Sequence, residues 1–585
     1  MPRINHGGFV GGFRATNRST GVTENLFLSY SSLDYANRNL DSLRHLSLGE
    51  SLFDWQEKTL SEQKVLYEYL LEESTRLLSE KRCPGTSRRD VEILVGHLAL
   101  QISRRLARSA MQMEGVASSH ILEKNPVNGS SRLSLELPVR TQDSYRSLAS
   151  TAVSRLIDQM AIARAFGVEY EMELTAAVVT ESRTSLNTSA LERFLRHPYL
   201  LLQRMFTKAT SRSRVSLSST YLGRFSEFML HLLLGQIPSL LELTPTIPVQ
   251  QEKSARKILL SSLDSTPVMS AKLMELLMPW NLVEGFSSTL ARAHSMGYAR
   301  NPSVIMTSNN FDTNDEFKAH LINSLPGAKY VVGQHGNNYG VSLISNICPE
   351  QNSADYFLSW GWESDSVGLI KFGQIKPKIR VRMRQSIRSV HLFLRDEMTD
   401  LHQADMTEPN RNYFGSIIQL CEALDGRQVQ TFLRLHASTS QEGADFLRSK
   451  IDSLASVEIA PKRQSIKQLL RSGHGVVFTY DSTGMLEMAS AKIPFFAFIP
   501  DGLGLIRDQF KNNYEELRKA GLLSQDPSES AELINEWISK SPNKRHDFQK
   551  GVARFAEGIV KLPTHRLRDL RRVLRGVQNM GPQKR

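Results

Sequence analysis

The sequence predicts an α/β protein with two Rossmann-like domains and a large helical elaboration in its N-terminal half. The chain has 585 residues, too many for a single hydrophobic core. Short apolar runs alternate with helical patterns in two stretches, 303–332 and 390–540, as in parallel sheets wound with helices. A basic segment at 371–388 separates these stretches and is suited to a connection between domains.

Composition excludes several classes of protein. Hydrophobic residues make up 40% and charged residues 23% of the chain, close to the averages of soluble globular proteins and far from those of disordered or fibrous chains. Cys83, Cys348 and Cys421 have no paired spacing, so neither a disulfide framework nor a zinc site is expected. We find no secretory signal and no apolar stretch of membrane-spanning length. A cytoplasmic protein is therefore expected.

The formal net charge of +12 favours anionic partners. Nucleotide diphosphates, lipid phosphates and nucleic acid all carry the required charge. Because the sequence has no zinc-finger spacing, no RNP-type aromatic motif and no basic block with interleaved aromatics, nucleic acid is not expected as the partner. Metabolite phosphates and an anionic membrane surface remain.

The elements of the N-terminal half follow in order. Residues 1–50 form a polar leader with a first strand at 26–28. Apolar spacings of three and four predict amphipathic helices from about 60 to 115, and helical patterning continues over 143–298. A Pro-containing segment, 244–249, interrupts it as a loop or edge strand. A β-α-β unit then follows, with strands at 304–307 and 329–332 around a helix at 315–325.

We therefore predict an N-terminal Rossmann-like domain over 51–370 and a basic connector over 371–390. A C-terminal Rossmann-like domain follows over 391–550, and a basic C-terminal helix and tail over 551–585. The strands and helices expected in the C-terminal domain alternate along the chain. The strands are at 390–394, 431–435, 475–479 and 494–499, and the helices at 412–425, 441–451, 483–491 and 527–540.

Polar and small residues follow the strand at 329–332 directly, where sheets of this kind place their ligands. The run is GQHGNNYG, residues 333–340. Its glycines, Gly336 among them, allow a close backbone approach to a ligand, while Gln334 and His335 supply donors and acceptors. We expect His335 to act as a general base, with Gln334 beside it. The alternative is a polar turn in which His335 caps neighbouring backbone.

A second cluster, FTYDSTG at 478–484, joins a strand to the helix at 483–491. Ser482, Thr483 and the first amides of that helix would form a phosphate cradle, because helix N-termini carry unpaired N–H groups and partial positive charge. Glu487 lies at the end of the first turn and would reach a ribose or sugar hydroxyl. Ordinary N-capping by Asp481 or Ser482 is the alternative.

A third cluster follows the strand at 431–435, where Arg434 and His436 project to the same side. A cation beside an imidazole suits a phosphate or nucleotide, but Arg434 could equally pair with a structural carboxylate. Trp360 and Trp362 follow another apolar run and are assigned mainly to the core. We find no DxD pair in a suitable setting, no Walker motif and no GxGxxG after a strand, so neither a metal-dependent mechanism nor P-loop chemistry is indicated.

Three motifs together resemble a family of bacterial transferases linked to O-antigen and other surface polysaccharides. These are GQHGNNYG after YVV, FLSWGW after ADY, and FTYDSTGMLEMASAKIPFFAF. The similarity is strongest over 303–540, extends to closing helices within 506–537, and reaches weakly to 89–105. It implies a GT-B-like fold and glycosyl transfer from a nucleotide-activated sugar.

The resemblance assigns roles to positions that match the family's motifs. His335 and Gln334 are expected to be catalytic on the acceptor-side N-terminal domain. Donor-binding residues are expected to be Gly336, Tyr339, Arg434, His436, Tyr480, Ser482, Thr483 and Glu487. The sequence departs from the family where Ala437 follows His436 in place of proline, and where Asn337 replaces a glycine. These departures put the donor contact of His436 in question.

The expected donor is a CMP-, UDP- or GDP-linked sugar, with no tightly bound cofactor. Related enzymes that use CMP-activated acidic sugars combine a His-Pro with a hydroxyl pair at a helix start, which makes a nonulosonate or Kdo-like donor an option. The expected acceptor is a glycan or lipid-linked glycan. At 565–575 three leucines share one helical face among five arginines. This helix either lies on an anionic inner membrane or packs on the body with a solvated basic face.

Three other functions fit the same scaffold. A nucleotide-sugar epimerase or a polyol-phosphate transferase would use related domains, and a non-catalytic glycan-assembly protein would keep the fold without the chemistry. The hypothesis of a transferase requires that His335 and the loop around Ser482, within residues 478–484, lie close together.

Overall fold

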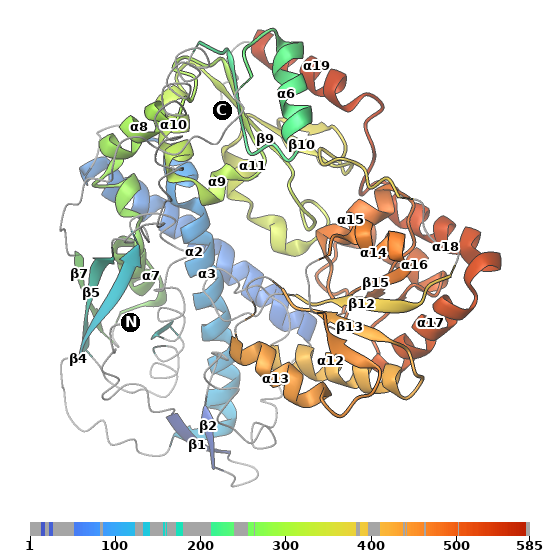
Figure 1. Cartoon of the computed structure of the whole chain (residues 1–585). Helices are drawn as coiled ribbons and strands as arrows, with labels where there is room; N and C mark the ends of the chain where they lie inside the picture. The colour runs from blue at the N-terminus through green and yellow to red at the C-terminus, as the bar shows by residue number, and fades with distance from the viewer. Residues whose placement is uncertain are drawn as a thin grey trace, which may run out of the picture.

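The computed structural model describes most of the chain, in segments. These are residues 13–17, 23–26, 52–81, 86–122, 133–140, 156–157, 160, 171–179, 212–238, 256–261, 264–381, 386–395, 410–436, 439, 441–460, 464–500 and 502–580. Two parallel sheets organise them (Figure 1). This confirms the α/β fold class with two Rossmann-like halves.

The N-terminal parallel sheet has five strands in the order β11-β10-β9-β8-β6. Its two central strands lie within the predicted β-α-β unit, and all neighbouring pairs run parallel. Buried apolar side chains explain why these short runs become strands with both faces covered. The strands are β6 (Val215–Ser218), β8 (Val304–Thr307), β9 (Lys329–Gly333), β10 (Tyr356–Ser359) and β11 (Leu369–Lys371).

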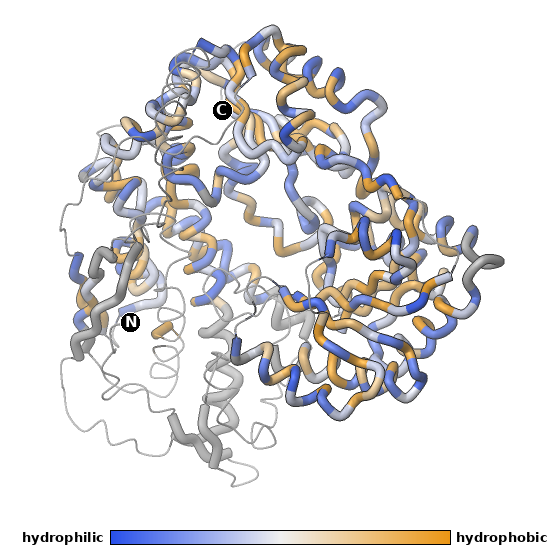
Figure 2. Tube along the Cα trace, viewed as in Figure 1, coloured by the Kyte–Doolittle hydropathy of each residue, from blue (hydrophilic) through white to orange (hydrophobic). Residues whose placement is uncertain are grey.

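The C-terminal parallel sheet has six strands in the order β14-β13-β12-β15-β16-β17. Figure 2 shows mostly hydrophobic residues, in orange, along its strands. Four of the strands were predicted to within two residues at either end, whereas the short edge strands β14 and β17 were not predicted. The strands are β12 (Ser389–Phe393), β13 (Thr431–Arg434), β14 (Val457–Ile459), β15 (His474–Phe478), β16 (Phe496–Phe498) and β17 (Leu523–Ser524).

Helices join the strands of the C-terminal sheet and cover it. The hydroxyl of Ser465 caps α14 in a capping box with Gln468, and Asp526 caps α17 through the backbone N–H of Glu529. The helices are α12 (Asn410–Asp425), α13 (Gln441–Ile451), α14 (Ile466–Ser472), α15 (Thr483–Ser490), α16 (Asp508–Lys519), α17 (Pro527–Ser539) and α18 (Ser541–Ala556).

The last helix, α19 (Arg566–Asn579), returns to the N-terminal half and lies beside α6 (Arg224–Leu234) (Figure 1). Leu570, Leu574 and Val577 are buried in a core shared with β6, β8, β9 and β10. The apolar face predicted over 565–575 is thus packed on the body. The helix therefore packs on the body through its apolar face, and Arg568, Arg572 and Arg575 on it are exposed.

The helical elaboration of the N-terminal half is built on two long helices, α2 (Leu52–Lys81) and α3 (Arg88–Ser119), as the spacing over 60–115 predicted. They pack on each other and on α7 (Thr266–Leu277) through a separate leucine-rich core. On its other side α3 contacts α10 (Asp315–Ser324) and α11 (Pro349–Ser353), and α8 (Phe286–Ser295) covers α10. A short helix, α9 (Asn310–Thr313), follows β8.

The prediction of a largely helical stretch over 143–298 was partly wrong. A three-stranded sheet forms in the order β4-β5-β7, with strands β4 (Leu133–Arg140), β5 (Glu171–Val179) and β7 (Arg256–Ser261). In β7 the burial alternates along the strand, a period of two that helical spacing does not give. β6 also lies within the stretch.

Near the N-terminus β1 (Phe13–Asn17) pairs with β2 (Thr23–Leu26) and β3 (His120–Leu122). The first strand expected at 26–28 therefore coincides with the structure only at Leu26, and 27–28 lie outside the described residues. The predicted loop at 244–249 also lies outside them.

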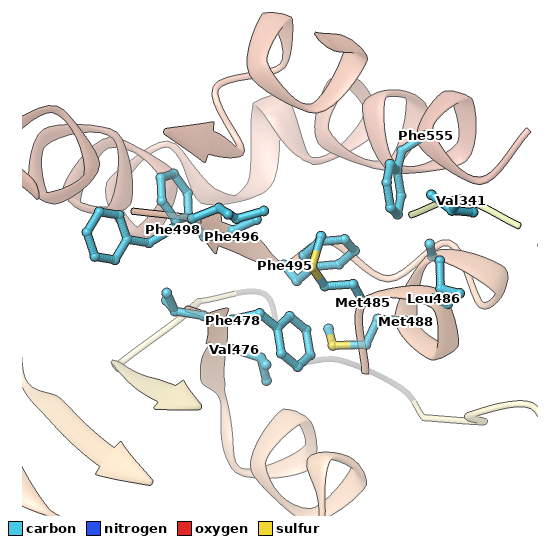
Figure 3. Packing of buried hydrophobic residues seen from close by; sticks show 14 of the residues in the cluster. Val341, Val476, Phe478, Met485, Leu486, Met488, Phe495, Phe496, Phe498 and Phe555 are labelled. Atoms are coloured by element: carbon cyan, nitrogen blue, oxygen red, sulfur yellow. The ribbon is translucent and has the colours of Figure 1, made fainter. Parts of the chain in front are cut away.

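The two halves share one continuous hydrophobic core. The backbone at 341–343 pairs with 505–507, where Arg507 N–H donates to Val341 O at 2.9 Å and Leu343 N–H donates to Leu505 O at 2.8 Å. Figure 3 shows Val341 of the N-terminal half beside Leu486 and Phe555 of the C-terminal half. All three belong to the same buried cluster. The halves are therefore joined by apolar burial as well as by hydrogen bonds.

A buried carboxyl group adds a polar link between the halves. Asp481 Oδ1 accepts a hydrogen bond from Asn337 Nδ2 at 2.7 Å and another from the Tyr514 hydroxyl at 2.8 Å. Burial raises the pKa of Asp481 to about 6, against the opposing effect of these two donors. A raised pKa means that the folded protein holds this proton more tightly than the unfolded chain does.

The substitution Asp481→Asn should stabilise the protein at pH 8 by about 1–3 kcal/mol and have little effect at pH 4. The reason is linkage: the wild-type contribution is present below the ordinary pKa of 3.8 and is lost as the pH rises through about 6. The uncharged amide keeps both accepted hydrogen bonds at its oxygen. Urea unfolding at the two pH values measures the difference.

Asp425→Asn is the matched control for this prediction. Hydrogen bonds from Ser456 lower the pKa of Asp425, so its replacement should cost stability at pH 8, the opposite sign. Equal effects of Asp481→Asn at both pH values would contradict the raised pKa.

Candidate functional site

The loop after β9 meets the loop after β15, which brings together carboxyl ends of strands from both sheets (Figure 1). The Asn337 N–H donates to Thr483 Oγ1 at 3.1 Å. A Cβ at Gly336 would come within 2.8 Å of that same oxygen, so the close approach requires glycine. The structure therefore brings the 334–340 and 481–483 clusters into direct contact.

Gln334 fixes the start of the first loop. Its Oε1 accepts from the Trp360 N–H at 2.7 Å and from Trp362 Nε1 at 2.9 Å, and its Nε2 donates to Gly336 O at 2.7 Å. The side chain is buried among these partners, with 1% of the residue exposed. These contacts place the Gln334 amide within the fold of the loop, and its catalytic role stays a prediction.

Further along the loop, Asn338 adopts a left-handed φ of 76°. Asparagine tolerates this conformation better than most residues do. The conformation turns the chain so that the N–H groups of Val341 and Ser342 both donate to Asn338 O. The turn holds Tyr339 beneath His335.

His335 lies at the carboxyl edge of the N-terminal sheet, enclosed by aromatic rings. Its ring centroid is 6.2 Å from that of Tyr221 after β6, 5.6 Å from Phe311 after β8 and 5.2 Å from Tyr339. Burial lowers the pKa of His335, and the Lys376 ammonium adds to this effect, against the charges of Glu350 and Asp312. The imidazole is therefore neutral at pH 7.

The contacts of Tyr339 determine the tautomer of this imidazole. The Tyr339 hydroxyl donates its single proton to the Glu350 carboxylate. Toward His335 Nδ1, 2.8 Å away, the same oxygen can then only accept. Nδ1 therefore carries the proton, and Nε2 presents a lone pair that makes no hydrogen bond within the described segments. A half-buried neutral imidazole in this state has a nitrogen that can accept a proton, as the predicted general base requires.

Ser482 stands at the N-cap position of α15 without performing the usual capping. Within the described part of the chain its hydroxyl makes no hydrogen bond, although the residue is 4% exposed. Asn337 Oδ1 and Asp481 Oδ2 are likewise buried, and no described residue binds them. Polar atoms in this state cost about 1–3 kcal/mol each. The N-capping alternative is therefore wrong for Ser482, and the phosphate cradle at the start of α15 stays a prediction. Asn337 Oδ1 and a carboxylate oxygen of Asp481 are acceptors, so they require donors and not an anion.

Of the other predicted donor residues, Glu487 and Tyr480 lie close to the Ser482 loop in sequence, whereas Arg434 and His436 follow β13, two strands away from β15. Glu487 forms an ion pair with Lys376 of the basic segment, Oε1 to Nζ at 2.9 Å, which bridges the halves. Arg434 donates through Nη2 to Gln464 O at 2.7 Å. His436 is partly buried just beyond β13, and Tyr480 is partly buried just before Asp481.

Sequence reasoning missed Arg395, which follows the strand β12 directly. It is 5% exposed, and its guanidinium lies 4.0 Å from the centre of the Tyr413 ring. Because β12 lies between β13 and β15, Arg395 occupies the same carboxyl edge as Arg434 and the Ser482 loop. Its position right after an apolar run was the signal that would have found it.

Two further residues, His97 and Glu350, were missed without any sequence signal. His97 lies on α3 and Glu350 on α11, far apart in sequence. They meet behind Tyr339, where His97 Nε2 is 3.2 Å from Glu350 Oε2.

The comparisons with solved structures give low similarity throughout. An O-GlcNAc transferase mutant from Thermobaculum terrenum has 10% identity and a TM-score of 0.33, over 90% of this chain and 98% of that one. MurG from Acinetobacter baumannii has 10% identity and a TM-score of 0.32, over 62% and 99%. UDP-GlcNAc 2-epimerase from Neisseria meningitidis, bound to UDP-GlcNAc, has 9% identity and a TM-score of 0.31. The match covers 50% of this chain and 79% of that one. At this level the likenesses carry no argument about substrate.

Among curated proteins, none matches this sequence. A family model does match, over residues 152–543, and it is described as LIC12162 family transferase. The match covers about two thirds of the 585 residues and includes both the His335 loop and the Ser482 loop. The transferase family expected from the three motifs is thereby confirmed: the chain belongs to the LIC12162 family of transferases.

Proposed function

We propose that this transferase moves a sugar from a nucleotide-activated donor onto a hydroxyl of a surface glycan, O-antigen or capsule-like, without a metal ion. The observation that carries the proposal is the state of His335, a neutral imidazole with its lone pair on Nε2, in the loop that contacts Thr483 of the facing half. On the facing half the N-terminus of α15 has a buried, unpartnered Ser482 hydroxyl. His335 would take the proton of the acceptor hydroxyl, and the Ser482 hydroxyl would donate to the negatively charged phosphate that leaves.

In the proposed reaction the acceptor hydroxyl gives its proton to His335 Nε2 as its oxygen attacks the anomeric carbon of the donor. The bond from that carbon to the nucleotide phosphate breaks, and the phosphate leaves with the bonding electrons. The Ser482 hydroxyl, the first amides of α15 and the cations Arg395 and Arg434 stabilise its charge. Tyr339 keeps His335 in the reactive tautomer.

A thermal-shift screen with CMP, CDP, UDP and GDP tests which nucleotide the protein binds. One base class should raise the melting temperature, since a ligand at 100 times its Kd stabilises the folded state by about 2.7 kcal/mol. Ser482→Ala should remove most of this shift, because the hydroxyl is one of the proposed phosphate donors, while the unliganded protein keeps its stability.

Ser465→Ala is the control for the nucleotide experiment, because Ser465 also stands at a helix N-cap of the same half. It should lower stability by about 0.5–2 kcal/mol through loss of its capping bond, yet leave the nucleotide-induced shift intact. A full shift with Ser482→Ala would contradict the phosphate site.

His335→Ala should lower kcat/KM for sugar transfer by roughly 10²–10⁴-fold, the usual contribution of a general base. The assay follows labelled sugar from donor to glycan with and without chelator, and cells that rely on the variant should lose the glycan. Full activity would rule out the proposed base. Conversion of the nucleotide sugar in the absence of any acceptor would instead identify an epimerase.

We also propose that the enzyme works on the inner face of the cytoplasmic membrane, where a lipid-linked acceptor would lie. No helix in the described residues is long and apolar enough to cross a bilayer. Phe225 and Leu232 lie seven residues apart on α6 and are 77% and 49% exposed, so they share one outward face. On the neighbouring α19, Arg568, Arg572 and Arg575 are exposed. An apolar stripe beside an arginine stripe is complementary to an anionic bilayer.

Flotation with vesicles tests this surface. Binding should be strong to vesicles of anionic phosphatidylglycerol and weak to those of zwitterionic phosphatidylcholine. Replacing the three arginines by serine should weaken the anionic binding by about a hundredfold, at about 1 kcal/mol for each arginine. The exposed arginines Arg427 and Arg448 in the C-terminal half supply the control substitutions, and equal losses from both sets would contradict the assignment.

A further inference from the structure

The contacts of His335 continue past Tyr339 into the N-terminal helical elaboration. The Tyr339 hydroxyl donates to Glu350 Oε1, and Glu350 Oε2 lies 3.2 Å from His97 Nε2. His97 Nδ1 in turn lies 3.9 Å from Asp312 Oδ1. The side chains of these last three residues are between 5% and 15% exposed. The result is a buried row of polar groups that leads from α3 to the proposed base.

Aromatic packing also connects the two histidines of this row. The Phe311 ring stacks on His97 with centroids 5.3 Å apart, and its centroid lies 5.6 Å from that of His335. One apolar ring therefore contacts both imidazoles. The polar connection between them runs through Glu350 and Tyr339.

The helix that carries His97 is anchored to the same region at several points. Arg89 pairs with Asp355 at 2.9 Å and donates to Ser353 O at 2.8 Å. Glu92 accepts from Asn352 at 3.0 Å and from Tyr67 at 2.8 Å. These bonds attach α3 to α11 and to the start of β10, so the position of His97 relative to Glu350 is fixed by several independent contacts.

We propose that His97 and Glu350 are positioning residues of the transfer reaction: Glu350 holds the Tyr339 proton and thereby the tautomer of His335, and His97 balances the charge of Glu350. This inference rests on the proposed function, in which His335 is the base. It makes the α2–α3 helices part of the catalytic unit, although His97 lies outside the matched residues 152–543.

The charges that face each group determine the direction of every effect. His335 faces Glu350 and Asp312, which raise its pKa, and Lys376 and His97, which lower it. His97 faces Glu350 and Asp312, which outweigh burial and the Lys318 ammonium and raise its pKa. Burial acts to raise the pKa of Glu350, but His97 and Tyr339 outweigh it and lower that pKa. Both shifts favour the charged forms, a Glu350 carboxylate beside a His97 imidazolium.

Two conservative substitutions should displace the pKa of His335 in opposite directions. His97→Gln removes a positive charge, so the pKa of His335 should rise and the acid limb of kcat/KM should move to higher pH. Glu350→Gln removes a negative charge but keeps an acceptor for Tyr339, so the acid limb should move to lower pH. Each displacement should be roughly half a unit or more.

The experiment measures the full chain in two ways. The pH profile of kcat/KM gives the acid limb, and NMR titration with ¹³Cε1-labelled histidine gives the pKa of His335 without any need for activity. His320→Gln is the control: His320 is fully buried on α10 and stacks on Tyr298 at 4.8 Å. It should cost stability and displace neither measurement.

Opposite displacements in both measurements support the inference. A pKa of His335 that stays fixed in both variants overturns it, even where the variants lose activity through instability. Displaced NMR titrations together with full transfer by His335→Ala would overturn the proposed base, and leave the charge balance between His97 and Glu350 in place.

Discussion

The chemistry of the site depends on the direction of one hydrogen bond, from the Tyr339 hydroxyl to the Glu350 carboxylate. The tyrosine hydroxyl has one proton to donate, and an ionised carboxylate has none, so the hydrogen bond can run only from Tyr339 to Glu350. This leaves the phenol oxygen as an acceptor for His335 and fixes which imidazole nitrogen is basic. If Glu350 were neutral, it could donate in its turn, and the tautomer of His335 would no longer be determined.

An ionised carboxylate in a buried position needs compensation, because desolvation alone would cost several kcal/mol. His97 provides it from a helix that belongs to neither parallel sheet. Burial of the pair in turn requires the leucine-rich contacts of α2, α3 and α7, which hold that helix in place. The helical elaboration and the loop after β9 therefore form one structural unit, since neither would keep its charges buried without the other.

The sequence was sufficient for the regular parts of this fold and for the loops that follow strands. The strands β8 and β9 and the helix α15 were predicted to within one residue, because short apolar runs and helical spacing are local signals. The strands of the separate sheet β4-β5-β7 were not predicted, although β4 (LSLELPVR) alternates apolar and polar residues, a local strand signal that was overlooked. Of the site, the contact between the 335–337 and 481–483 segments followed from the rule that ligands lie at the carboxyl ends of strands. The partners His97 and Glu350 did not follow, because 253 residues separate them along the chain and only tertiary packing joins them.

The unpartnered polar atoms at the junction come from both halves. Asn337 Oδ1 belongs to the N-terminal loop, whereas Ser482 Oγ and Asp481 Oδ2 belong to the C-terminal one. The hydrogen bond from Asn337 to Asp481 holds these atoms close together. Asn337 Oδ1 and a carboxylate oxygen of Asp481 can only accept, so they require donors, whereas the Ser482 hydroxyl can donate to a phosphate. In the proposed reaction the phosphate would therefore meet Ser482, and donor groups such as sugar hydroxyls would meet the other two atoms.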